Sequence, residues 1–217
     1  MQLTSPILDI PSSLIQEGHI YLVEDDENLR SDLSGILSQC GFTVDAYADA
    51  ETFLSQATEV NPSVIVADIV LPEKSGIDLL KIVRASGRDI PIIYISGDSE
   101  PHQIIEAMKS GADDFLWKPL CINSLTSSVK SALRKDQLRS KNAYKLAEIQ
   151  ESFQSLTQRE RQIYQLAVSG NSNLEISKLL NIQPDTAKKH RSRVMEKMNA
   201  SNLAQLIECY QYLSGQN

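Results

Sequence analysis

Residues 63–68 read SVIVAD, a short run of apolar, mostly β-branched residues that ends in an acid. Such a run is typical of a strand that is covered on both faces of a sheet. Four further short runs have strand character: HIYLVE (19–24), FTVDAYA (42–48), PIIYISG (91–97) and DDFLWK (113–118). The sequence therefore predicts five strands, each followed by a segment with a different periodicity.

Those following segments predict helices. Over residues 27–41, Leu29, Leu33, Ile36 and Leu37 recur at the spacing of one helix face, and Gly41 is placed to end the helix. The other predicted helices cover 49–58, 76–87 and 102–111, and a last one begins near Ile122. Right-handed crossovers between parallel strands then give an α/β, doubly wound, five-stranded parallel sheet of flavodoxin-like form.

Ionisable and hydroxyl side chains follow the predicted strand ends, where the sites of such sheets lie. They are Glu24, Asp25, Asp68, Ser96 and Lys118. Carboxylates that lie together raise each other's pKa unless a cation intervenes, and their oxygens suit Mg²⁺. With Lys118 as a fixed positive charge, the site predicts phosphoryl binding, with Asp68 as nucleophile and the Ser96 hydroxyl as a donor to a phosphoryl oxygen.

Each residue has a simpler interpretation when it is taken alone. The acidic turn EDDE (24–27) is typical of a solvated helix cap, and a single Asp or Ser after a strand is typical of a loop. The functional prediction therefore depends on their joint arrangement at successive strand ends.

The same stretches resemble the receiver domain of two-component response regulators. The resemblance is carried by VEDDENLR (23–30), VADIVLPEKSG (66–76), YISG (94–97) and SGADDFLWKP (110–119). Asp68, Leu71, Pro72 and Gly76 meet the pattern D-x-x-[ML]-P-x-x-x-G.

The resemblance assigns roles to the acidic residues. It implies that Asp68 is the phosphoacceptor and that Asp25 is a direct Mg²⁺ ligand. It further implies that Glu24, where Asp is commoner in the family, acts through water, and that the backbone carbonyl of Val70 is a ligand.

The resemblance also identifies a switch. It implies a cis peptide bond between Lys118 and Pro119, and a switch pair formed by Ser96 and Phe115. Phe115 stands where Tyr is frequent in the family, so it offers packing without a hydroxyl group.

The last part of the chain predicts only helices. LTQRERQIYQLAVSG (156–170) begins with a capping box of Thr157 and Glu160 and ends at Gly170. Further helices are predicted over 171–183, 184–198 and 201–213. Two short helices joined by a tight turn, the second of them basic, predict a small all-α helix-turn-helix domain.

The helix over 184–198 has an apolar side and a polar side. Ala187, Val194 and Met198 share one side, while Asp185, Lys188, Lys189 and Ser192 share the other. We expect Lys188, Lys189 and Ser192 to reach base edges in the major groove of DNA. Phosphate contacts are expected from Arg191, Arg193 and Lys197, and packing or a phosphate contact from His190. A merely solvated basic face is the alternative.

Residues 156–213 also resemble the LuxR-type helix-turn-helix. The matching residues are Leu156, Thr157, Arg159, Glu160, Gly170, Asn173, Glu175, Ile176, Thr186, Lys188, His190 and Lys197. The departures are Leu174, where Lys is usual, Gln183 and Pro184 at the turn, and Ala187. Together, the two resemblances are those of a transcriptional response regulator of the FixJ/NarL type.

The predicted organisation has four parts: a flexible arm over 1–17, a receiver domain over 18–136, a helical linker over 137–152 and the helix-turn-helix domain over 153–217. Charge divides in the same way. Residues 1–137 hold 10 basic and 21 acidic residues, whereas residues 138–217 hold 11 basic and 7 acidic residues. The basic balance of the second part favours nucleic acid as its partner.

Composition narrows the class of protein. The chain has 217 residues, of which 41% are hydrophobic and 23% charged, as in ordinary globular proteins. It has no apolar stretch that could cross a membrane. The first 18 residues contain no Lys or Arg, and Pro6 and Pro11 interrupt their apolar parts, which argues against a secretory signal peptide. The three cysteines form no CxxC spacing, which favours a reducing cytoplasm.

These observations predict a phosphorylation-switched, DNA-binding transcription regulator. A sensor histidine kinase is its expected phosphodonor, and promoter DNA is its expected target. A homodimer is expected after phosphorylation, and RNA polymerase is a further candidate partner. The resemblance implies a phosphoacceptor rather than an enzyme, and slow self-dephosphorylation is compatible with that role.

Two other classes of function are compatible with parts of this sequence. The first is a signalling adaptor whose basic module binds RNA or protein; salt-dependent binding to duplex DNA would discriminate. The second is a metal-dependent phosphatase, which usually needs a second Asp two residues after the nucleophile, where this chain has Val70.

Overall fold

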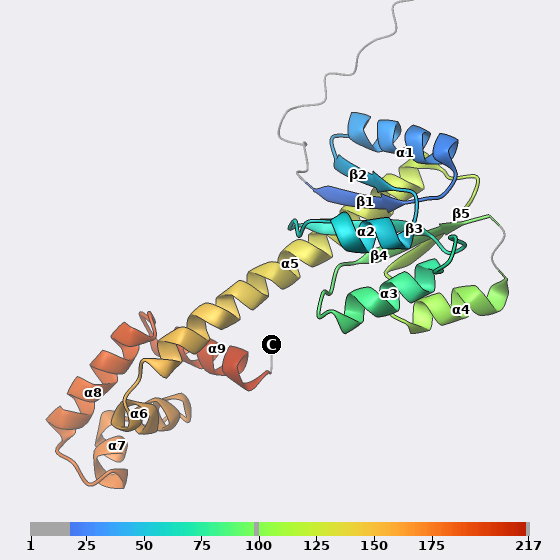
Figure 1. The fold of residues 1–217 in the computed structure, drawn as a ribbon. Helices are drawn as coiled ribbons and strands as arrows, with labels where there is room; N and C mark the ends of the chain where they lie inside the picture. Colours follow the sequence, from blue (N-terminus) through green and yellow to red (C-terminus); the bar gives the residue numbers. More distant parts are fainter. Residues whose placement is uncertain (1–17, 98–99, 216–217) are drawn as a thin grey trace, which may run out of the picture. The chain divides into compact units, whose positions relative to one another are not determined.

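The computed structural model describes residues 18–97 and 100–215, and Figure 1 shows their fold. The predicted flexible arm over 1–17 lies outside these described residues. The chain divides into two compact units, with the boundary between Ser140 and Lys141. This boundary falls inside the segment predicted as a linker.

Five strands form the sheet of the first unit: β1 (His19–Val23), β2 (Thr43–Tyr47), β3 (Ser63–Asp68), β4 (Ile92–Ser96) and β5 (Asp114–Trp117). Their order is β2-β1-β3-β4-β5, and all neighbouring strands are parallel. The predicted doubly wound five-stranded parallel sheet is confirmed. Because β1 and β3 are neighbours at the centre, with Val23 opposite Ala67, the acids that follow them lie at one place on the sheet edge.

Helices cover both faces of this sheet (Figure 1). They are α1 (Glu27–Gln39), α2 (Ala50–Gln56), α3 (Gly76–Ala85), α4 (Pro101–Lys109) and α5 (Ile122–Gln154). One face packs against α1 and α5 through Leu37, Leu125 and Val129, while Phe53 and Leu80 from α2 and α3 pack against the other face. Both faces are buried, which explains why the strand sequences are apolar without alternation.

The second unit contains the last turns of α5 and four further helices: α6 (Gln158–Val168), α7 (Asn173–Leu179), α8 (Pro184–Lys197) and α9 (Leu203–Ser214). Ile163, Ile176, Val194 and Leu206 are fully buried in its core. The predicted all-α character is confirmed.

Two local predictions have different outcomes. The capping box of Thr157 and Glu160 is present at the start of α6, as predicted. The helix predicted over 171–183 is shorter than expected, because Ser172 caps its start and Asn181 adopts a left-handed φ of 49° after its end. Such a backbone conformation ends a helix and is better tolerated by Asn than by most residues.

Within residues 18–97 and 100–215, no helix combines the length and the apolar character needed to cross a membrane.

Candidate functional site

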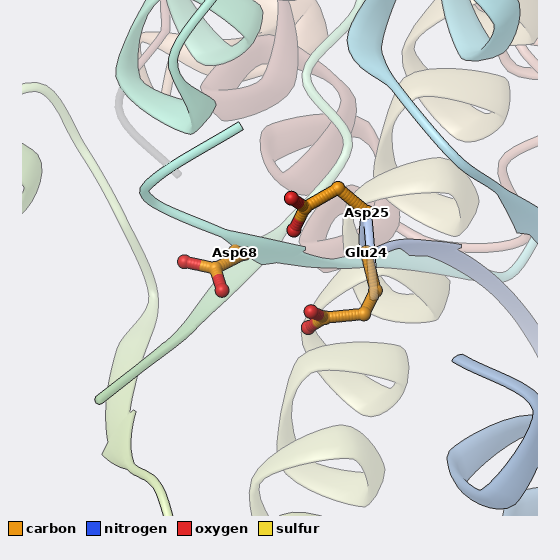
Figure 2. Close-up of side chains that lie close together, drawn as sticks. All are labelled: Glu24, Asp25 and Asp68. Atoms are coloured by element: carbon orange, nitrogen blue, oxygen red, sulfur yellow. The ribbon is translucent and has the colours of Figure 1, made fainter. Parts of the chain in front are cut away.

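Three carboxylates converge at the carboxyl edge of the sheet. Glu24 and Asp25 follow β1, and Asp68 ends β3. Figure 2 shows the three side chains together, and one carboxylate oxygen from each lies within 4.8 Å of the others. Glu24 and Asp68 are buried, whereas Asp25 is exposed. The structure therefore brings together the acids that the strand-end argument singled out.

Lys118, which follows β5, bridges two of these acids. Its Nζ lies 2.5 Å from Oδ2 of Asp68 and 2.8 Å from Oε2 of Glu24. Its backbone N–H donates to the Ser96 carbonyl at 2.9 Å, and the Lys118–Pro119 peptide bond is cis. The ammonium group is thus held by two carboxylates and by the backbone of the neighbouring strand.

Burial and ion pairing act on these groups in opposite directions. Burial raises the pKa of Glu24 above its usual value, because desolvation outweighs the hydrogen bonds from Lys118. Burial lowers the pKa of Lys118, but its hydrogen bonds to Asp68 and Glu24 outweigh this effect, so that the pKa is raised overall. Lys118 therefore remains a fixed positive charge at neutral pH.

Local backbone geometry fixes the orientation of the Asp68 carboxylate. Its Oδ1 accepts a hydrogen bond from the Val70 backbone N–H at 2.8 Å, while Oδ2 faces Lys118. Gly76 packs directly against the backbone of Asp68. A Cβ at position 76 would lie 2.3 Å from the Asp68 carbonyl oxygen. Any residue larger than glycine would displace the strand end that carries Asp68.

The predicted switch residues lie on the neighbouring strands β4 and β5. Ser96 is buried at the end of β4 and is paired in register with Trp117. Phe115 is half-buried on β5, where its ring meets that of Trp117 edge to face at a centroid distance of 5.0 Å. Trp117 itself is 54% exposed, so this aromatic pair lies at the surface beside the acidic edge.

Arg30 is a supporting residue that the sequence analysis missed. Its guanidinium donates hydrogen bonds to the backbone carbonyls of Glu24 at 2.7 Å and Asp25 at 3.1 Å. It lies on α1, whose start is capped by Asp26. The sequence offered one sign of this role: Arg30 follows the acidic stretch EDDE (24–27) by one helical turn, which places it near the site.

The donor set fits a hard divalent cation. The described residues group three carboxylates, two of which are paired with one lysine, so carboxylates outnumber cations in the cluster. Oxygen ligands of this kind suit Mg²⁺, which one or two carboxylates and waters usually hold. The arrangement also sets a carboxylate nucleophile, Asp68, beside a fixed cation, as phosphoryl transfer requires.

The second unit presents a basic helix face. Ala187, Val194 and Met198 of α8 are buried, as their spacing predicted. Lys188, Lys189, Ser192 and Arg193 are exposed, and the part of the chain that the structure describes contains no ion pair to any of them. These side chains are therefore available for contacts outside the molecule.

The other predicted DNA-contacting residues have internal partners or buried atoms. Arg191 donates from Nη1 to the Asn171 carbonyl at 3.1 Å and to Oδ1 of Asn173 at 3.3 Å. Lys197 lies 2.8 Å from the carboxylate of Glu160. Nδ1 of His190 is buried and has no hydrogen-bond partner among the described residues. Sequence spacing gave no sign of these internal contacts.

Two family models match the chain, one in each unit. Residues 20–130 match the response regulator receiver domain, and residues 154–210 match the bacterial regulatory proteins of the luxR family.

Curated relatives match across both parts. The transcriptional regulatory protein FixJ of Bradyrhizobium diazoefficiens is 35% identical over 191 residues, which cover 88% of this chain and 93% of that protein. The tetrathionate response regulatory protein TtrR of Salmonella typhimurium is 31% identical and covers 90% of this chain and 93% of that protein.

Solved structures are similar as well. The response regulator StyR matches with a TM-score of 0.80 and 32% identity, over 89% of this chain and 98% of that one. Full-length FixJ from B. japonicum matches with a TM-score of 0.57 and 34% identity, over 92% of this chain and 98% of that one.

Proposed function

The chain belongs to the two-component response regulators that join a receiver domain to a LuxR-type DNA-binding domain, and from this premise we propose how its residues act. As a member of this family, it is a phosphorylation-dependent transcription regulator. The proposal concerns the phosphorylation site, the ion it uses, the switch and the DNA contacts.

Asp68 is the phosphoacceptor, and a sensor histidine kinase is the donor. A carboxylate oxygen of Asp68 attacks the phosphorus atom, the bond from phosphorus to the kinase histidine breaks, and an acyl phosphate forms on Asp68. The observation that carries this assignment is the position of Lys118. Its Nζ lies 2.5 Å from Oδ2 of Asp68 and can stabilise charge on the transferred group. Ser96, at the end of β4, is the hydroxyl donor to a phosphoryl oxygen.

The acidic cluster would hold Mg²⁺. Asp25 and Asp68 would be its carboxylate ligands, Glu24 would act through water, and the backbone carbonyl of Val70 would be a further ligand. The clustered carboxylates support this assignment. Bound Mg²⁺ supplies charge neutralisation for the phosphoryl oxygens.

Phosphorylation shifts Ser96 and Phe115 and favours a homodimer through the face around α4 and β5. Three large apolar side chains of this face are exposed: Ile105 (55%), Met108 (47%) and Trp117 (54%). Light scattering should show an increase in mass on phosphorylation. An unchanged monomer at tens of micromolar would contradict this part of the proposal.

The output step is recognition of promoter DNA by α8. Lys188, Lys189 and Ser192 contact bases, and Arg193 contacts phosphates, with His190 beside it. Lys188, Lys189, Ser192 and Arg193 are exposed and have no ion pair within the described chain, which supports their roles, whereas His190 is half-buried. RNA polymerase is a further proposed partner at the promoter, and a reducing cytoplasm is the proposed compartment.

The direct test couples the two steps. The full chain is incubated with Mg²⁺ and a small-molecule phosphodonor, and its affinity for duplex DNA is measured before and after. We expect a gain in affinity in the unaltered protein and none in Asp68→Asn. An equal gain in both proteins would exclude Asp68 as the switch, and salt-independent binding would argue against phosphate contacts by α8.

A further inference from the structure

The basic residues of the second unit fall into two groups. Arg159 and Arg161 donate hydrogen bonds to the backbone carbonyls of Leu180 and Leu156, at 2.9 and 3.1 Å. Arg191 and Lys197 also have internal partners. By contrast, the described chain contains no ion pair to Lys178, Lys188, Lys189 or Arg193. A count of basic residues therefore overstates how many cations are available to DNA.

Arg191 makes the most informative of these internal contacts. It lies half-buried near the middle of α8. Its two acceptors are the Asn171 carbonyl, in the turn before α7, and the side chain of Asn173, the first residue of α7. The Asn171 side chain in turn donates to the Leu166 carbonyl of α6 at 2.9 Å. A continuous set of hydrogen bonds thus connects α6, the turn before α7, and α8.

These hydrogen bonds can fix the rotation of α8 about its own axis, which its apolar face defines less sharply. That face has few large rigid side chains: Ala187 and Val194 are fully buried, alanine has no side chain beyond Cβ, and the flexible Met195 and Met198 complete the contact with the core. Apolar contacts are non-directional, so they define the rotation of a helix about its own axis less sharply than hydrogen bonds do. Base readout by Lys188 and Ser192 depends on that rotation.

We propose that Arg191 and Asn173 form a clamp that sets the rotation of the recognition helix, so that Arg191 is a positioning residue for base readout rather than a phosphate contact. This inference rests on the proposed role of α8 in DNA recognition. It separates Arg191 from Arg193, which lies two residues further along the same helix and is exposed.

Two substitutions separate the alternatives. Arg191→Lys keeps the positive charge, which is enough for a phosphate contact. The lysine side chain is shorter and lacks the rigid guanidinium plane that aims the two N–H groups of Nη1 at the Asn171 and Asn173 acceptors. Asn173→Ala removes the side-chain acceptor of the clamp without changing any charge. Arg193→Lys and Arg193→Gln are the matched controls on the exposed side of α8.

The probes are a duplex selected from a random-sequence pool by the phosphorylated full-length protein, and a scrambled duplex of the same composition. We expect Arg191→Lys to lower affinity for the selected duplex by about tenfold. Asn173→Ala should lower it by a smaller factor, because the hydrogen bond from Arg191 to the Asn171 carbonyl remains. Affinity for the scrambled duplex and the salt dependence of binding should stay unchanged. The double variant should lose no more than Arg191→Lys alone, because Asn173 contributes to the clamp only through its hydrogen bond with Arg191. Arg193→Gln should instead weaken both duplexes equally and make the salt slope shallower by about 1.

Three results would overturn the inference. One is normal binding by Arg191→Lys together with a shallower salt slope in Arg191→Gln, since a phosphate contact behaves in this way. Another is additive losses in the double variant. The third is a loss of affinity in Arg191→Lys that accompanies a lower melting temperature and is absent when binding is measured well below that temperature. Such a result would mean that the variant is only less stable. If the unaltered protein bound no duplex, the DNA role of α8 itself would be refuted, and the inference with it.

Discussion

The acidic edge of the sheet and the basic face of α8 handle charge in opposite ways. At the sheet edge, like charges lie together, largely buried, and Lys118 bridges Asp68 and Glu24. On α8, the cations are separated: Arg191 and Lys197 have internal partners, while others face solvent. The first region concentrates charge around one small site, and the second distributes charge over a surface.

The difference shows how each region can serve its ligand. A phosphoryl group and its metal ion are compact, so the site that receives them must hold several charges within a few ångströms. A DNA backbone is extended, so the surface that meets it needs cations at separate positions. On α8, the cations without ion pairs among the described residues are the ones assigned to the ligand, and the paired ones maintain the geometry. At the sheet edge, by contrast, the paired groups Asp68 and Lys118 are themselves the ones assigned to the reaction.

The strongest way to break this comparison is to remove the nucleophile. Asp68→Asn keeps the shape of the side chain and the acceptor for the Val70 N–H, but it lacks the carboxylate that attacks phosphorus. We expect no phosphoryl gain, measured by intact mass after incubation with Mg²⁺ and a small-molecule phosphodonor. Asp32→Asn, at an exposed position of α1, is the control and should be phosphorylated normally. An acid- and base-labile phosphoryl group on Asp68→Asn would place the acceptor elsewhere.

The second prediction removes the cation that bridges the pocket. Lys118→Met leaves Asp68 and Glu24 without their ammonium partner, so developing charge on the transferred group is less well stabilised. We expect the phosphorylation rate to fall by about 10²-fold. Mg²⁺ affinity should rise, because the ion no longer competes with the lysine for the carboxylates. Fluorescence of Trp117, the single tryptophan, is a probe of both steps because it precedes Lys118.

The control for this prediction is Lys109→Met, at the end of α4 and away from the strand ends. It should change neither the rate nor the Mg²⁺ affinity. An unchanged phosphorylation rate in Lys118→Met would show that the lysine serves the fold and not the reaction.

The sequence predicted the first region more completely than the second. The five strands are short, apolar and in regular alternation with helices, so their topology follows, and topology alone brings Asp68, Glu24 and Lys118 to one edge. The second region was predicted from the spacing along α8, which gave the exposed and buried sides correctly for Lys188 and Val194.

The contacts that spacing could not provide are hydrogen bonds from side chains to distant groups. Arg191 and Arg30 both donate to backbone carbonyls, and every residue type carries such a carbonyl, so no residue pattern identifies the partner. The sequence predicts phosphate contacts for both Lys197 and Arg193, yet the ion pair of Lys197 with Glu160 depends on how α6 and α8 pack. The same limit applies to Gly76, whose motif position was clear but whose close approach to Asp68 was not.

The third prediction tests the paired cation of the second region against an unpaired one. Lys197 donates to the buried carboxylate of Glu160 at 2.8 Å and to the Ser155 carbonyl at 3.0 Å. Lys197→Met should lower the stability of the second unit by about 1–3 kcal/mol, since the buried carboxylate of Glu160 loses its charged donor and keeps only those of Thr157. Lys189→Met, at an exposed position, should stay within about 0.5 kcal/mol. Hydrogen exchange of the α6 to α9 amides measures both, and equal effects would remove the distinction between paired and unpaired cations.

The smallest predicted effect is a pH dependence that also separates the two regions. Burial raises the pKa of Glu24, whereas Lys197 and the Thr157 cap lower the pKa of Glu160 to about 2. A carboxyl with a depressed pKa contributes stability above its unfolded value of 4.5, and that contribution is lost as the pH falls toward about 2. The second unit should therefore lose stability progressively over this window, with a smaller share from Glu175, whose pKa the Ser172 cap also lowers.

Hydrogen exchange of the α6 and α8 amides, corrected for intrinsic rates, should show this slope in the unaltered protein and in the exposed control Glu196→Gln. Glu160→Gln should be less stable at neutral pH but should show a flatter slope, because its amide does not titrate. An identical slope in Glu160→Gln would mean that other carboxyls cause the acid sensitivity, and that the Lys197 ion pair contributes little to holding α8 against α6.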